Sequence, residues 1–162
     1  MNKFAFFIAC LLLSGVAFSQ EQVVNLSHQP GYSQEVYFHF ETEAVHSIAV
    51  NSWELAFNRT GFRDLGTRIN DGLEIEVYEM SLNPDDYDAV TPNDITENTP
   101  RWYNSDSQWD IGAFDQRTDP NNPFFYGWGI YNPATHHIDG VATYILKYPD
   151  NTFKKFMIED FM

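Results

Sequence analysis

The stretch FFYGWGIYNPATHHIDGVATYILKYPDNTFKKFMIEDF, residues 124–161, carries the clearest fold signal in the chain. Two of its segments, Val141–Tyr148 and Phe153–Asp160, alternate in polarity on either side of Pro149-Asp150-Asn151-Thr152. Period-two alternation around a turn predicts an antiparallel hairpin. Proline presets the φ angle of such a turn, and asparagine tolerates the left-handed conformation that follows. The alternating apolar residues, predicted to face the core, are Ala142, Tyr144, Leu146, Phe156 and Ile158.

Short alternating segments also precede this stretch, at 35–41, 45–50, 53–57, 65–70 and 73–78. Asn70-Asp71-Gly72 predicts a tight hairpin turn. From Ser81 to Arg117, small polar residues and prolines interrupt any long element, so helix is expected for only a turn or two near Pro84. The sequence therefore predicts an all-β fold, a single antiparallel β domain over residues 20–162 with long irregular middle loops.

Residues 1–19 have the features of a signal peptide. Lys3 is followed by an apolar run, and Ala17-Phe18-Ser19 matches the small-x-small pattern before a cleavage site. A lipoprotein anchored through Cys10 is the weaker alternative, because the apolar run continues beyond that cysteine. The mature chain is predicted to be exported to the periplasm, cell surface or extracellular space. The run is shorter than the roughly 20 residues that span a bilayer, so no transmembrane segment is expected in the mature chain.

The composition narrows the classes of partner. The chain has 23 acidic against 9 basic residues, a formal net charge of −14. Such a charge repels nucleic acid and anionic lipid surfaces, so neither is expected as a partner. Removal of the signal peptide takes the single cysteine with it, so no disulfide and no thiolate nucleophile are expected.

Catalytic motifs are missing from the sequence. It contains no G-x-S-x-G elbow and no phosphate-binding glycine loop, so an enzyme is not predicted. Glu74 and Glu76 share one strand face, which leaves a glycosidase carboxylate pair open, although a solvated face explains them equally well. The histidines lack the spacing of a metal motif, so no metal site is predicted. His46 shares a face with Ile48 and is expected to be a core histidine.

The adjacent His136 and His137 are the main candidates for ligand contact. Neighbouring side chains of an extended chain point to opposite faces, so the two cannot grip one ion without a turn or bulge. The alternative is that one packs against aromatic neighbours while the other is solvated.

The pattern YGWGxYNPxTHHI, followed by a strand, a turn and TFKKFMI, resembles the end of the haem-binding HmuY family of Bacteroidetes surface proteins. The earlier stretches VYFHFETE and SWELAFNR resemble the opening strands of that family. The resemblance implies an exported all-β haem carrier that serves iron acquisition and delivers its cargo to an outer-membrane receptor. It also implies axial ligands from the middle of the domain.

That middle stretch, 72–116, contains no histidine, and Met80 is its only soft ligand. Haem iron takes axial His or Met ligands. We therefore expect haem, if bound, to lie against the aromatic block of Tyr126, Trp128 and Tyr131, with Met80 or one of the two histidines as an axial ligand. A β module that has lost haem ligation and binds a protein, a glycan or another small apolar ligand is the alternative. The candidate ligand-binding residues are Met80, Tyr126, Trp128, Tyr131, His136 and His137.

Overall fold

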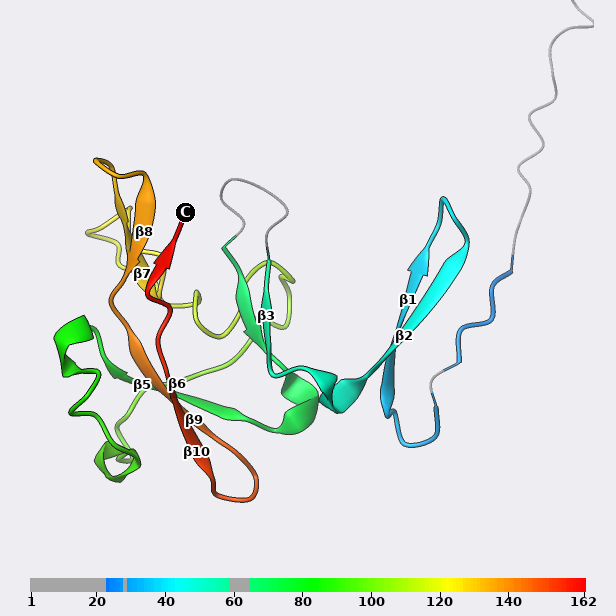
Figure 1. The fold of residues 1–162 in the computed structure, drawn as a ribbon, viewed down its shortest axis with the longest axis horizontal. Coiled ribbons are helices and arrows are strands. Elements are labelled where there is room, and N and C mark those ends of the chain that lie inside the picture. Colours follow the sequence, from blue (N-terminus) through cyan, green and yellow to red (C-terminus); the bar gives the residue numbers. More distant parts are fainter. Residues whose placement is uncertain (1–22, 28, 59–64) are drawn as a thin grey trace, which may run out of the picture.

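The computed structural model describes residues 23–27, 29–58 and 65–162. The predicted signal peptide and Cys10 lie outside these residues. The described chain is all-β, as predicted, and its sheets are antiparallel with only short 3₁₀ helices between the strands (Figure 1). None of its helices is long or apolar enough to cross a membrane.

The central sheet has four strands in the order β10-β9-β5-β6. A three-stranded sheet has the order β11-β8-β7, and two hairpins pair β1 with β2 and β3 with β4. The strands are β1 Gln34–His39, β2 Ala44–Ala49, β3 Leu55–Phe57, β4 Thr67–Ile69, β5 Glu76–Ser81, β6 Arg101–Trp102, β7 Gly129–Asn132, β8 His137–Gly140, β9 Thr143–Lys147, β10 Phe153–Phe156 and β11 Asp160–Phe161. The 3₁₀ helices are η1 Val50–Ser52, η2 Asp71–Leu73, η3 Pro84–Asp86 and η4 Pro92–Asp94.

The predicted C-terminal hairpin is confirmed at its centre, where Phe153 is paired with Lys147 and Phe156 with Tyr144. Asn151 adopts the expected left-handed conformation, with φ 60°. The hairpin is shorter than predicted, because after Phe156 the chain leaves β9 and its Asp160–Phe161 segment pairs with β8 instead.

Strand β9 is buried on both faces rather than on one. Tyr144 and Leu146 enter the core as predicted, yet Thr143 and Ile145 are also enclosed. Lys155 on β10 donates to the backbone carbonyls of Tyr87 and Val90, which holds the loop after β5 near this strand pair. The alternation predicted that only one face of β9 would be buried. The strand is instead buried on both faces, and the loop after β5 lies beside the β9–β10 pair.

A turn forms at Asn70, where the Leu73 amide donates to Asn70 O, but the hairpin expected across it is wrong. Residues 71–73 form η2, and β4 pairs with β3 rather than with β5. The Asn70 side chain is buried and donates to the carbonyls of Val50 and Trp53 while it accepts from Gly72 N. This amide ties η1 to η2, the junction from which the β1–β2 hairpin projects (Figure 1).

The β1–β2 pairing agrees with the predicted strands at 35–41 and 45–50. His46, however, is exposed on β2, so its expected place in the core is wrong. The core lies instead between the other sheets, where Phe114 contacts the ring of Tyr144 edge-on at 4.9 Å and that of Phe156 at 5.4 Å.

Candidate functional site

The aromatic block begins with a tight turn that returns the chain onto itself. The Tyr126 amide donates to Gly129 O at 2.8 Å, and the Tyr131 amide donates to Phe124 O at 2.8 Å. Gly127 has φ +77°, and a Cβ there would meet the Phe114 backbone, so the turn requires glycine. Residues on this turn are therefore set in position by backbone bonds.

The turn separates its aromatic side chains. Trp128 is 2% exposed and belongs to the core, so its ring presents no surface to a ligand. Tyr126 is half-buried against that core. Phe124, in contrast, is 47% exposed, and its ring centroid lies 5.8 Å from that of half-buried Tyr131. Of the four, only Phe124 and Tyr131 form an accessible aromatic pair.

The β7–β8 turn then brings His136 to this pair. Its backbone has φ 61°, and its amide donates to Asn132 O at 2.8 Å. Asn132 in turn accepts from Ala134 N and donates to Asp139, both at 3.0 Å. The left-handed residue ends the turn and aims the imidazole back at β7.

The Tyr131 Oη atom and the His136 Nδ1 atom lie 2.7 Å apart, a short hydrogen bond. The bond has two forms. In one, Tyr131 donates to Nδ1 and Nε2 carries the imidazole proton. In the other, Nδ1–H donates to Oη, and Nε2 has a free lone pair. The second form is the usual arrangement of a metal-binding histidine, whose other nitrogen donates to an acceptor. We call Phe124, Tyr131 and His136 the Tyr131 face.

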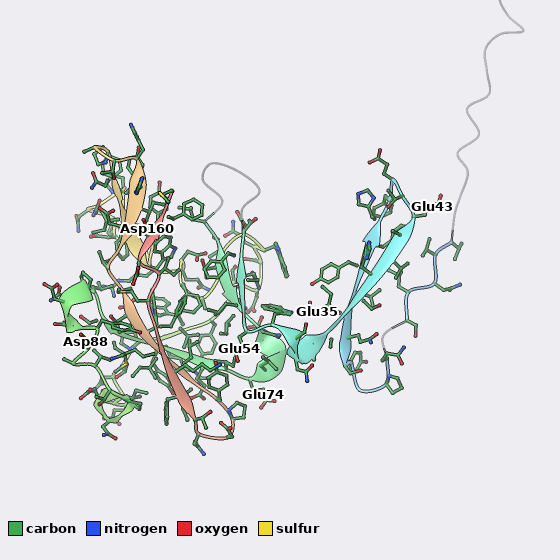
Figure 2. The ribbon with its side chains drawn as sticks, in the orientation of Figure 1. Glu35, Glu43, Glu54, Glu74, Asp88 and Asp160 are labelled. Carbon is green, nitrogen blue, oxygen red and sulfur yellow. The ribbon has the colours of Figure 1, made fainter. Side chains whose placement is uncertain are left out.

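His137 has a different partner. It begins β8, is half-buried, and its Nδ1 lies 3.9 Å from the Asp160 carboxylate on β11. Asp160 is labelled in Figure 2. This contact between His137 and Asp160 is an ion pair only when the imidazole is protonated. The two adjacent histidines therefore contact different residues: His136 contacts Tyr131, and His137 contacts Asp160.

Met80 lies on the central sheet, apart from the elements that carry the Tyr131 face. It is half-buried in β5, where the pairing with β9 shifts register between Glu79 and Ser81. The contacts of the described residues join Tyr131 to His136 and do not join Met80 to either histidine.

The sequence did not predict an ion pair between buried Glu79 and half-buried Arg117. The Glu79 carboxylate is enclosed and contacts the Arg117 guanidinium and Trp102 Nε1. Burial raises the pKa of Glu79 above its usual value, although Arg117 and the Trp102 hydrogen bond act in the opposite direction. The sequence did indicate that Glu79 is buried, because it lies two residues from inward-facing Val77 on β5 and so shares its face.

The glutamates of the suggested glycosidase pair have dissimilar settings. Glu74 has φ 53° and caps η2, whereas Glu76 begins β5 and contacts Arg101 at 3.0 Å and Lys147 at 3.1 Å. A hydrogen bond from Tyr78, with Lys147 and Arg101, lowers the pKa of Glu76. A general acid needs a raised pKa, so Glu76 is unsuited to that role.

No protein-family model matches this chain, and comparison with characterised proteins and with solved structures gave no match. In the described ranges, no three His, Cys, Asp or Glu side chains gather closely enough to hold a metal ion.

Proposed function

We propose that this chain is an exported, non-catalytic carrier that binds haem, or a similarly flat apolar ligand, on the Tyr131 face. The observation that carries the proposal is the 2.7 Å hydrogen bond between Tyr131 and exposed His136. In the form in which Nδ1–H donates to Tyr131 Oη, Nε2 has a free lone pair that is directed away from this bond and can ligate iron.

The donor set suits a porphyrin better than a bare ion. The porphyrin supplies the equatorial nitrogens, so the protein needs to add only one or two axial ligands. Phe124 offers an exposed ring beside Tyr131, on which a flat apolar macrocycle can stack. The resemblance of the C-terminal stretch to HmuY-type haem carriers supports the same ligand.

Hemin titration tests the proposal. Wild-type protein at micromolar concentration should give a saturable spectrum with a sharp Soret band. His136→Ala should remove the axial imidazole and shift the bound iron towards a high-spin spectrum or abolish saturation. Tyr131→Phe keeps the ring but removes the hydrogen bond, so binding should weaken while the ligand type persists.

His137→Ala and Met80→Ala are the matched controls, and both should leave the spectrum unchanged. A spectrum that responds to either of them and not to His136→Ala would assign the axial ligand elsewhere and overturn this site. If wild-type protein gives no saturable spectrum, the chain is not a haem carrier.

A further inference from the structure

A cleft beside the central sheet is a second candidate binding site. The cleft, of about 540 Å³, lies between the start of β5 and the β9–β10 turn. Its volume falls within the roughly 300–1,000 Å³ typical of small-ligand sites. Its lining includes Glu74, Glu76, Arg101, Tyr103, Lys147 and Tyr148. Figure 2 places Glu74 where η2 meets β5. The cleft lining includes no residue of the Tyr131 face and does not include His137.

The cleft lining carries three carboxylates, Asp71, Glu74 and Glu76, and two basic groups, Arg101 and Lys147, so its formal charge is only −1. Half-buried Glu76 is shared by Arg101 and Lys147, and it also accepts a 2.8 Å hydrogen bond from Tyr78. A ligand with a large charge of either sign would have to disrupt these pairs. A neutral ligand rich in hydroxyl groups would not, because a hydroxyl donates to carboxylates and accepts from ammonium or guanidinium groups.

Two aromatic rings complete the lining, and both are held in place. Tyr103 is 56% exposed, and the Arg101 guanidinium lies over its ring at 4.9 Å. Tyr148 has Lys154 at 4.9 Å over its ring, and its hydroxyl donates to Glu54 at 2.8 Å. Pre-positioned rings lower the entropy lost when a ligand stacks on them.

We propose that this cleft binds a neutral saccharide. The C–H face of a pyranose ring stacks on Tyr103, and its hydroxyls bond to Glu74, Glu76 and Arg101. The site is independent of the Tyr131 face, so either function can hold without the other.

The test is an NMR titration of the ¹⁵N-labelled protein with neutral hexasaccharides of glucose, xylose, mannose and N-acetylglucosamine, and with hexagalacturonate as the acidic comparison. At least one neutral hexasaccharide should give saturable shifts around the β9–β10 turn, and hexagalacturonate should bind more weakly. Tyr103→Ala should weaken binding by about tenfold or more, which corresponds to the loss of one good contact. Tyr103→Phe keeps the stacking ring and should retain affinity.

Trp109→Ala is the control, because Trp109 is an aromatic residue that is even more exposed than Tyr103 and lies outside the cleft lining. It should leave saccharide affinity unchanged. The proposal fails if no neutral hexasaccharide saturates at millimolar concentration, if hexagalacturonate binds more tightly, or if Tyr103→Ala has no effect. The hemin spectrum of Tyr103→Ala should equal that of wild type, which separates a failure here from a failure of the carrier function.

Discussion

Thr143 offers a sharp test of how the core is built, because its side chain is completely buried in β9 and its hydroxyl has no hydrogen-bond partner among the described residues. An unsatisfied buried polar group costs about 1–3 kcal/mol relative to its hydrated state. Thr143→Val replaces the hydroxyl with a methyl group of similar size and keeps a β-branched residue in the strand. The variant should therefore be more stable than wild type by about 1–2 kcal/mol.

Thr67→Val is the matched control. Thr67 is also buried in a strand, but its hydroxyl donates to Leu65 O at 3.3 Å. The substitution removes that bond, so it should lower stability by about 1 kcal/mol. The two changes are chemically identical and should have opposite signs.

Urea unfolding followed by tryptophan fluorescence and by circular dichroism measures both effects. The midpoint should shift without a change in the slope, since the buried surface is nearly the same. In a thermal melt the gain corresponds to about 2–4 °C per kcal/mol. If Thr143→Val destabilises as much as Thr67→Val, then the Thr143 hydroxyl has a partner and the reasoning is wrong.

Three further predictions concern stability. Phe156→Ala, which removes a ring that contacts Phe114, should cost about 3 kcal/mol in a urea melt, whereas Phe153→Ala on the more exposed part of β10 should cost less than about 1 kcal/mol. Burial raises the pKa of Asp115 to about 7, so the folded state binds the carboxyl proton more tightly than the unfolded state does. The stability that this protonated carboxyl contributes is therefore lost as pH rises from about 4 to about 7. Asp115→Asn should become more favourable relative to wild type across that window, and a pH-independent difference between the two would contradict the raised pKa. Asn70→Ala should cost about 3 kcal/mol, because it leaves two carbonyls and an amide without their partner, and a loss under about 1 kcal/mol would mean that water replaces the side chain.

The sequence predicted the β9–β10 hairpin because its determinants are local. Pro149 and Asn151 set the turn, and the alternation on each side sets which side chains face inward. The pairing of β5 with β9 depends on residues far apart in the chain, such as Val77 and Leu146, and no local pattern encodes it. Asn70 shows the same limit, since its side-chain NH₂ donates to the carbonyls of Val50 and Trp53, which lie far outside the triplet that indicated a hairpin.

The candidate site could likewise be predicted only in part from the sequence. Aromatic and histidine residues in one short segment indicated a candidate region, but burial decides which of them are accessible, and Trp128 is enclosed while Phe124 is not. The bond between Tyr131 and His136 depends on a left-handed backbone at the histidine, which residue spacing alone does not reveal.

The basic residues of the described chain have internal partners, which has a consequence for haem. Glu76 pairs with Arg101 and Lys147, Glu79 with Arg117 and Glu54 with Lys154, while Arg68 and Lys155 donate to backbone carbonyls. To reach one of these described basic groups, a propionate of bound haem would have to break an existing contact; Arg59 and Arg63 lie outside the described residues. We expect the propionates to remain in water, where the net charge of −14 repels them. Because salt screens that repulsion, hemin affinity should stay constant or rise between low and high NaCl. A steep fall in affinity with salt would instead indicate a direct contact between a propionate and a basic side chain, and would contradict the expectation of solvated propionates.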